Sequence, residues 1–294
     1  MARSPAETTD PIVQRLRTLA QDSPDLKDAA QVYEIILPLL RDVNLHVSPI
    51  ALTPDQARTK LEMGLPLLQD VDLELDAKAA CDLMLRLACA LQTTIEESRP
   101  PQLAMAAHWI QLALEDNALD FSVLVPHVAT GDKEFVITLA QSLQLNSDLV
   151  WTLAQNTLKP ALRAWHRQLT TLVEGIPWHK GYCFVCGAGA TLGELQENNQ
   201  VKHLRCGQCG ADWQFPRLQC MYCGNQDHDT LSYLYAESQP DKMRVEVCNQ
   251  CHGYLKVIAA FSPTQPELLA VEDLATLHLD YIAQERGYAR VAFQ

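Results

Sequence analysis

Four Cys-x-x-Cys pairs stand close together in the sequence: Cys183-Phe-Val-Cys186-Gly187, Cys206-Gly-Gln-Cys209-Gly210, Cys220-Met-Tyr-Cys223-Gly224 and Cys248-Asn-Gln-Cys251-His252. Two cysteines at this spacing, in a tight turn, can place both sulfur atoms on one metal ion. The glycine that follows three of the pairs tolerates positive φ and lets backbone N–H groups approach the thiolates. Four such sulfur atoms form a closed tetrahedral site, which suits Zn²⁺ or a single iron ion.

The four pairs form an internal repeat of two units. The pairs of the first unit are separated by 19 residues, those of the second by 24, and only ten residues separate the units. If each unit closes on itself, the metal ligands are Cys183, Cys186, Cys206 and Cys209 in one site and Cys220, Cys223, Cys248 and Cys251 in the other. An interleaved arrangement of the pairs is one alternative, and redox dithiols or disulfides are another.

The predicted sites point away from catalysis. Four sulfur ligands leave no open position for water or substrate, so hydrolytic metal chemistry is not expected. The sequence has no Gly-rich phosphate loop, no Gly-x-Ser-x-Gly elbow and no nucleophile–base set, and we predict that the protein is not an enzyme. Small β modules have little core, so metal binding should supply much of their folding free energy. A purely structural role and a redox or iron-sensing role both remain open.

Charge is distributed unevenly along the 294 residues. The formal net charge is −13, which argues against a general nucleic-acid binder because phosphate affinity depends on Lys and Arg. Residues 180–256 carry seven Lys or Arg and eight Asp or Glu, so nearly all of the acidic excess lies elsewhere. Such an acidic surface either serves solubility alone or docks a basic partner or a basic leader peptide.

The N-terminus and the hydropathy pattern indicate a cytoplasmic protein. A single arginine, Arg3, precedes no apolar segment of the kind found in secretory signals. No run approaches 18 uninterrupted apolar residues, so no membrane span is expected. In a reducing compartment, closely spaced cysteines are metal ligands or redox centres more often than structural disulfides.

The first part of the chain, residues 1–175, has the periodicity of a multi-helix domain. Asp10-Pro11 and Thr53-Pro54 are typical of helix starts, and Ser147 is expected to cap a further helix. The remaining helices are predicted over residues 26–40, 76–97, 103–115 and 147–174, with disturbances at Pro38 and Pro160 and a turn at Gly131-Asp132.

From Gly175 onward the pattern changes to short β-like runs rich in glycine. We expect a first four-cysteine module at residues 176–216, a second at 217–262, and a C-terminal segment, 263–294, with a helix over about 267–285. Strands are predicted over residues 201–205, 231–235, 244–247 and 255–259.

Other chemically notable residues are interpreted more simply. Cys81 and Cys89 are expected to be core thiols on one helix face. His252, in place of the usual glycine, is expected at the surface, and His228 in a polar turn. Aromatic and histidine side chains near the cysteines are expected to pack the small modules onto the helices; they are Trp178, His179, Tyr182, Trp213 and Phe215.

Over nearly its whole length the chain resembles the formate dehydrogenase accessory protein FdhE family. The resemblance rests on the helical N-terminal half, on the four ordered cysteine pairs, and on the segments 204–213, 251–256, 272–280 and 287–290. One departure is Phe184, because such pairs often carry proline at that position. The resemblance implies an α+β fold: a multi-helix domain, two rubredoxin-like or zinc-ribbon-like β modules and a C-terminal helix.

The resemblance also implies a function. The chain would be a cytoplasmic, chaperone-like maturation protein that binds the catalytic subunit of respiratory formate dehydrogenase. The eight cysteines would hold two mononuclear iron centres, each with four cysteine ligands, and zinc is the alternative metal. Two other classes remain to be weighed: a zinc-ribbon protein that binds nucleic acid or another protein through structural zinc, and a thiol–disulfide enzyme.

Overall fold

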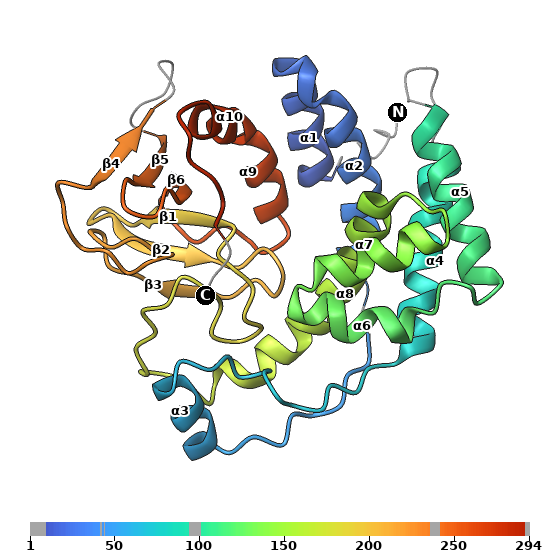
Figure 1. The fold of residues 1–294 in the computed structure, drawn as a ribbon, viewed down its shortest axis with the longest axis horizontal. Helices are drawn as coiled ribbons and strands as arrows, with labels where there is room; N and C mark the ends of the chain where they lie inside the picture. Colours follow the sequence, from blue (N-terminus) through green and yellow to red (C-terminus); the bar gives the residue numbers. More distant parts are fainter. Residues whose placement is uncertain (1–9, 42, 44, 94–100, 236–241, 292–294) are drawn as a thin grey trace, which may run out of the picture.

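The computed structural model describes residues 10–291 apart from 42, 44, 94–100 and 236–241. Its helical half and its sheet lie side by side, and the last two helices stand between the sheet and the first helix (Figure 1). The fold class predicted from the sequence is confirmed. The predicted end of the helix at residue 97 and the N-terminal residues 1–9 lie outside the described part of the chain.

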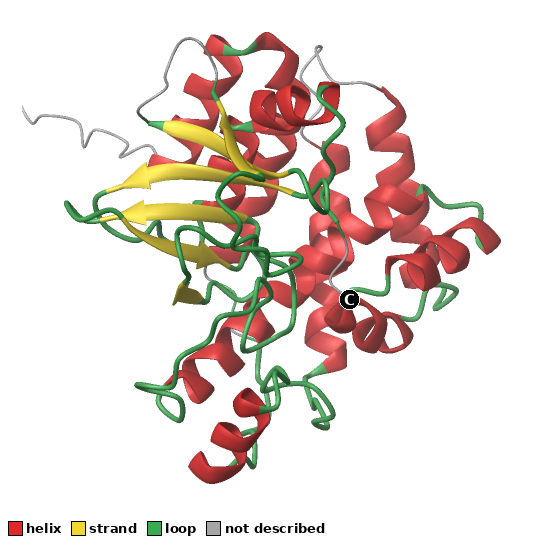
Figure 2. Cartoon of the chain, turned by 60° about the vertical axis from the view of Figure 1, so that its left-hand side comes forward, coloured by secondary structure: helices red, strands yellow, loops and turns green. Residues whose placement is uncertain are grey.

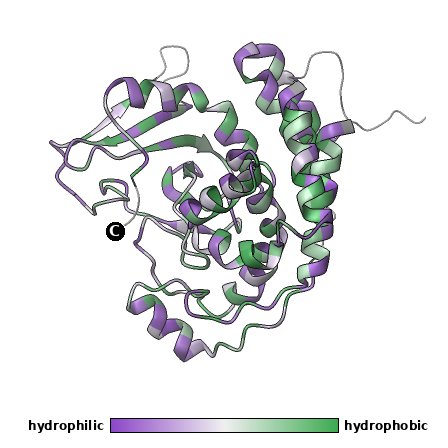
Figure 3. Ribbon diagram, turned by 45° about the vertical axis from the view of Figure 1, so that its right-hand side comes forward, coloured by the Kyte–Doolittle hydropathy of each residue, from purple (hydrophilic) through white to green (hydrophobic). Residues whose placement is uncertain are grey.

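Eight α-helices and one 3₁₀ turn make up the described part of the N-terminal half. They are α1 (Pro11–Asp22), η1 (Pro24–Leu26), α2 (Lys27–Arg41), α3 (Pro54–Glu62), α4 (Ala77–Thr93), α5 (Pro101–Glu115), α6 (Phe121–Thr130), α7 (Lys133–Ser142) and α8 (Ser147–Thr170). Both apolar and polar residues occur along these helices, as in amphipathic helices (Figure 3).

Local capping explains where several helices begin. The Asp10 side chain accepts a hydrogen bond from the N–H of Ile12, and Thr53 forms a reciprocal capping box with Gln56. The expected cap at Ser147 was wrong by one residue, because the Asn146 side chain accepts from the N–H of Leu149 and Ser147 is the first helical residue.

Tertiary packing overrides two local signals. Pro38 and Pro160 lie inside α2 and α8, which continue past them, and Pro160 is itself buried. The sequence marked the Gly131-Asp132 turn but not the two flanking helices, α6 and α7. Gly131 ends α6 at a φ of 76° and Asp132 caps α7.

The longest of the described helices, α8, lies at the centre of the helix packing. It packs against α2, α4, α5, α6 and α7. Its buried residues, among them Leu158 and Trp165, belong to one continuous apolar core that also contains Phe184, Leu204 and Trp213 of the first module. The helical domain and the first four-cysteine module therefore share a core, and the boundary at residue 175 remains a prediction.

The two modules form a single six-stranded sheet of order β3-β2-β1-β6-β5-β4 (Figure 2). Its strands are β1 (Leu192–Gln196), β2 (Val201–Arg205), β3 (Asp212–Gln214), β4 (Leu231–Leu234), β5 (Met243–Cys248) and β6 (Tyr254–Ala260). Pairing inside each module is antiparallel, whereas β1 and β6 pair in parallel and join the modules. The two units of the repeat thus lie beside each other in the same orientation.

The predicted C-terminal helix is two helices, α9 (Leu269–Ala275) and α10 (Leu277–Glu285). The break has a local cause at the carbonyl oxygen of Asp273. The Lys256 ammonium donates to this oxygen at 2.7 Å and the Thr276 hydroxyl donates at 3.1 Å, where the next helical N–H would otherwise bind. The two helices then pack on different surfaces. Val271 of α9 contacts the α1–α2 pair, and Leu279 of α10 packs on β5.

Buried ion pairs fix the central strands. The Arg205 guanidinium lies 2.6 Å from the Glu194 carboxylate, and both side chains are almost completely buried. Arg205 also donates to the carbonyl of Thr264, and Glu194 accepts from the Gln196 amide, so β1, β2 and the chain before α9 are joined. None of the helices in the described part of the chain has the length and apolar character needed to cross a lipid bilayer.

Removing the charge at Glu194 should destabilise the protein strongly. We expect Glu194→Gln to lower the free energy of unfolding by about 3–5 kcal/mol, because it removes the carboxylate nearest to the buried Arg205 charge and leaves only the half-buried Asp212, 3.6 Å away. Urea denaturation followed by circular dichroism measures this change. Glu197→Gln, an exposed change in the following turn, is the control and should stay within about 0.5 kcal/mol. Equal midpoints for the two variants would contradict the assignment.

Candidate metal centres

Each Cys-x-x-Cys pair with the residue after it forms a turn, here called a knuckle, and the four knuckles share one backbone geometry. The residue after the second cysteine donates its N–H to the carbonyl of the first cysteine at 2.9–3.0 Å in Gly187–Cys183, Gly210–Cys206, Gly224–Cys220 and His252–Cys248. The first cysteine donates to the carbonyl five residues on, at 2.8–3.0 Å, in Cys183–Ala188, Cys206–Ala211, Cys220–Asn225 and Cys248–Gly253. Such a turn presents both sulfur atoms on one side.

The residue that closes each knuckle has positive φ. The values are 80° at Gly187, 81° at Gly210, 71° at Gly224 and 56° at His252. Histidine is among the non-glycine residues that adopt this region more readily, so His252 can replace glycine without changing the turn. Its side chain is exposed, as predicted, and its ring lies 5.9 Å from that of Tyr288.

The eight cysteines gather into two groups. The first cluster contains Cys183, Cys186, Cys206 and Cys209, the second contains Cys220, Cys223, Cys248 and Cys251, and within each cluster all sulfur atoms lie within 4.8 Å of one another. This is the sequential arrangement, and the interleaved one is not found.

The sulfur separations fit a tetrahedral metal site. They are 3.4 and 3.6 Å across the first cluster and 3.6 and 3.8 Å across the second. A tetrahedron with metal–sulfur distances of about 2.3 Å has edges of about 3.8 Å, whereas a disulfide requires about 2.05 Å. Each cluster can therefore hold one four-coordinate ion, iron or zinc.

The first cluster is buried between the sheet and α8. Cys183, Cys206 and Cys209 are at most 1% exposed, and only Cys186 is half-buried. Phe184, the residue that departs from the expected proline, packs edge-on against Trp213 and His166 with ring centroids 6.3 Å apart in both pairs. This side chain anchors the first knuckle to the helix.

Burial divides the thiols of the first cluster. It raises the pKa of Cys183 and Cys209 well above that of an ordinary thiol. Neighbouring thiols that donate to Cys206 lower its pKa well below that value. Without a metal ion, a negative charge is therefore favoured at Cys206 over Cys183 and Cys209.

The helix α8 presents cationic groups to this cluster. Burial, together with the neighbouring Arg163, lowers the pKa of Lys159 to about 8, and a thiolate at Cys206 acts in the opposite direction. The Lys159 ammonium donates to the Asn156 side chain at 2.9 Å. Arg163 is held by Glu267 and by the carbonyl of Pro266, each at 3.1 Å. The sequence analysis missed these residues, and only their helical spacing of four could have suggested them.

The second cluster is more open. Cys223 is exposed and Cys251 is half-buried. Burial raises the pKa of Cys220, and raises that of Cys251 to about 11. At Cys248 burial is outweighed by the backbone N–H groups of the fourth knuckle and the Asn225 side chain, 3.6 Å from the sulfur, which lower its pKa to about 7.

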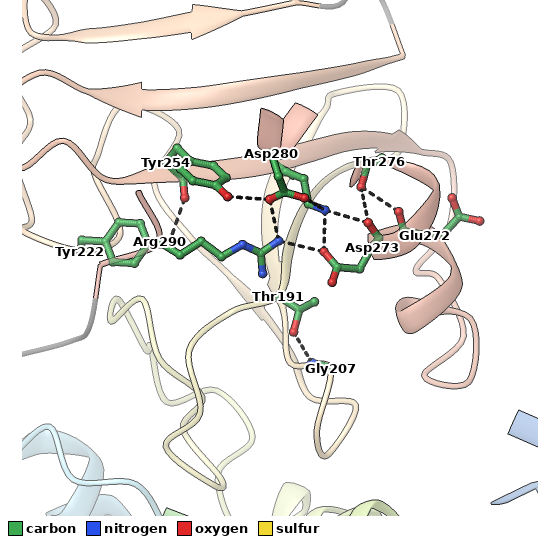
Figure 4. A network of polar contacts seen from close by, with 10 residues as sticks. Thr191, Gly207, Tyr222, Tyr254, Glu272, Asp273, Thr276, Asp280 and Arg290 are labelled. Carbon is green, nitrogen blue, oxygen red and sulfur yellow. Dashed lines mark hydrogen bonds and ion pairs between the residues drawn. The ribbon is translucent and has the colours of Figure 1, made fainter. Parts of the chain in front are cut away.

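A polar network ties the second module to the C-terminal helices (Figure 4). Lys256 is fully buried and lies 2.6 Å from Asp280 and 2.7 Å from Asp273, and Arg290 lies 3.2 and 2.9 Å from the same carboxylates. The Tyr254 hydroxyl donates to Asp280 at 2.6 Å. The segments that carried the family resemblance, 251–256, 272–280 and 287–290, meet in this network, although their sequences did not indicate the contact.

The other residues singled out from the sequence lie outside the two clusters. Cys81 and Cys89 are half-buried on α4 rather than deep in the core. His228 lies in an exposed turn, as expected. The Trp178 and Trp213 indoles donate to the carbonyls of Tyr182 and Lys180, so these aromatics do pack the first module, but His179 is exposed and does not.

The knuckles do not have the setting of a thioredoxin-like site. Such a site places its Cys-x-x-Cys pair at the start of a helix. All four pairs of this chain lie instead in turns beside β-strands. Fold and site together define a class of protein in which a helical domain carries two closed four-cysteine centres within one sheet.

Comparison with known proteins shows a similarity to FdhE proteins. Residues 218–294 match the model described as "FdhE, C-terminal domain". The chain is 30% identical over 176 residues to the protein FdhE homolog of Aquifex aeolicus, covering 57% of this chain and 60% of that protein, and 28% identical over 138 residues to the protein FdhE of Escherichia coli O127:H6, covering 44% and 43%. The chain thus matches less than two thirds of these relatives' length.

A solved structure extends the likeness to the whole fold. The crystal structure of the FdhE protein from Pseudomonas aeruginosa superposes with a TM-score of 0.65 over 95% of this chain and 92% of that one, at 22% identity. The chain therefore resembles FdhE proteins in sequence over part of its length and in fold over nearly all of it.

Metal uptake should release protons and depend steeply on pH. Each cluster contains two thiols with raised pKa values, Cys183 and Cys209 or Cys220 and Cys251, and both must lose their protons to bind a metal ion. We expect at least about two protons per Zn²⁺ at pH 7, with affinity falling at least about a hundredfold per pH unit as the pH is lowered. Calorimetry in buffers of different ionisation enthalpy measures the release. Uptake without proton release would contradict this geometry.

Substitutions of the residue that closes a knuckle should lower the free energy of unfolding by different amounts. Gly210→Ala places a Cβ at a φ of 81° and 2.7 Å from Pro266, so it combines strain with overlap, and we expect a loss of about 2–4 kcal/mol. Gly224→Ala has a similar φ, but its Cβ would make only an ordinary contact, 3.8 Å from the Gln219 amide nitrogen, so it should lose about 1–2 kcal/mol. His252→Gly should lose little, because glycine suits the turn. Chelator-induced metal release and urea denaturation measure the series, and equal losses would refute it.

Proposed function

We propose that the protein is an accessory protein that binds the catalytic subunit of respiratory formate dehydrogenase in the cytoplasm and assists its assembly or redox activation. Similarity to FdhE proteins, in sequence over residues 218–294 and in fold over nearly the whole chain, carries the proposal. The closed four-sulfur clusters support it further, because they leave no coordination position for a substrate and suit a binding protein.

We further propose that the two clusters hold iron, with zinc as the alternative ion. The ligands would be the eight knuckle cysteines, and an Fe–S₄ centre supplies one-electron chemistry with little change of geometry. The chain's own residues exclude water from the first cluster, where three cysteines are buried, and leave the second accessible at Cys223. Such a pair combines a protected centre with one that a partner can approach.

The partnership can be tested with cysteine variants. We expect the wild-type protein to co-purify with the formate dehydrogenase catalytic subunit and to restore formate dehydrogenase activity in a host that lacks its own FdhE. Cys206→Ser and Cys248→Ser should each lose metal and reduce both readouts at least about tenfold, because three ligands cannot close a four-coordinate site. Cys81→Ser, a half-buried thiol outside the clusters, is the matched control and should behave as wild type.

Metal analysis separates the two ions. Protein purified anaerobically should contain two metal ions per chain, and iron should give sulfur-to-iron charge-transfer bands in the visible spectrum. Two zinc ions and no such bands would replace iron by its alternative and leave the partnership standing. Reproducible failure to bind the catalytic subunit, under oxidising and reducing conditions alike, would refute the accessory function itself.

A further inference from the structure

A large groove lies between the helical domain and the first cysteine module. Its volume is about 1260 Å³, above the roughly 300–1,000 Å³ of common small-molecule sites. One wall is the connection between α3 and α4, residues 63–76, and the opposite wall is α6, with Val125 and Ala129. In Figure 1 this connection is the long segment that leaves α3 and ends at α4.

The α3–α4 connection directs its acidic and its apolar side chains to opposite sides. From residue 70 to residue 75, acidic side chains alternate with apolar ones. Asp70, Asp72 and Glu74 are exposed, whereas the intervening Val71 and Leu73 are half-buried. Alternation of this kind in an extended segment directs the two types of side chain to opposite sides. The groove therefore has an apolar floor and an acidic rim.

The charge of the groove has one sign. The described residues that line it include three acidic ones, Asp70, Asp72 and Glu74, and no Lys, Arg or His. Two lysines stand near one end: Lys60 donates to the carbonyl of Gln69, and Lys180 lies close to Gly64. Most of the rim thus favours a cationic occupant.

The groove also reaches the first cluster. Cys186 and Gly187 of the first knuckle belong to its lining, and Cys186 is the half-buried member of that otherwise buried cluster. Pro66 packs against Gly187, within 3.1 Å of where a Cβ would lie, so the α3–α4 connection and the knuckle are in direct contact. An occupant of the groove would lie beside the sulfur of Cys186.

We propose that this groove binds an extended segment of a partner polypeptide that directs Lys or Arg side chains to Asp70, Asp72 and Glu74 and apolar side chains to the floor. The volume and open apolar floor suit a peptide better than a small polar ligand, and the acidic rim selects a basic one. The inference deepens the proposed function, on which it rests for the identity of the partner: the formate dehydrogenase catalytic subunit would supply the segment.

A peptide assay tests the chemistry of the groove without the client. The probe is a fluorescein-labelled dodecapeptide of alternating Arg and Leu or Ala, compared with the same peptide carrying Glu for Arg. We expect the basic peptide to bind, and to bind more weakly as salt is raised. The triple variant Asp70→Asn, Asp72→Asn, Glu74→Gln should bind it about tenfold more weakly, the sum of three exposed ion pairs.

The substitutions are chosen to spare the fold. Asp70 has a φ of 55°, which asparagine tolerates, and the amide oxygen introduced by Glu74→Gln can still accept the hydrogen bond that the Ser48 hydroxyl donates to Glu74. The matched control neutralises three exposed aspartates at the α1–α2 turn, Asp22→Asn, Asp25→Asn and Asp28→Asn, and should bind like wild type. A second variant, Ala129→Trp, fills the groove and should abolish binding at all salt concentrations.

The client experiment uses a photo-crosslinking residue at Ser122, an exposed position of α6 in the groove lining. Crosslinks to the catalytic subunit that disappear in the triple variant would support the inference.

If the subunit co-purifies equally well with wild type and both groove variants and gives no crosslink, the groove is refuted while the accessory function stands. If the basic peptide binds the groove but the subunit does not bind at all, the groove stands and the accessory function fails. Equal binding of the basic and acidic peptides would overturn the proposal in either case.

Discussion

The convergence of four sulfur atoms in each module is the constraint on which the second half of the molecule depends. Four knuckles with the same hydrogen bonds bring eight thiols to separations of 3.4–3.8 Å across two clusters. Burial opposes ionisation of most of these thiols, while hydrogen bonding favours a thiolate at Cys206 and Cys248. A shared metal ion is therefore needed to hold the four sulfur atoms of each cluster together. Metal affinity and folding free energy are thus coupled in both modules.

The two modules are nevertheless joined to each other and to the helices. Parallel pairing of β1 with β6 makes one sheet, the Arg205–Glu194 pair ties that sheet to the segment before α9, and Lys256 ties it to α9 and α10. Since α9 also packs on α1 and α2, the first helices of the described chain contact its C-terminal part. Loss of either cluster should therefore destabilise parts of the structure outside its own module.

The sequence was most informative where one local rule sufficed. Cysteine spacing predicted which thiols meet, and Asp10-Pro11 and Thr53-Pro54 predicted helix starts, because each signal acts within a few residues. It was least informative where distant groups compete. The break between α9 and α10 depends on Lys256, which lies 17 residues before Asp273, and the β1–β6 pairing depends on strands from different repeats. No periodicity within a single segment records such contacts.

The two clusters differ in how their charge would be balanced. An ion bound by four thiolates leaves a net negative charge, which is costly in a buried site unless cations stand nearby. At the first cluster α8 supplies Lys159 and Arg163, and the half-buried Cys186 lines the groove. At the second, water reaches the exposed Cys223 directly. Tandem repeats of nearly the same knuckle have thus been placed in unlike surroundings, and the difference arises from the helical domain, which covers one centre and leaves the other accessible.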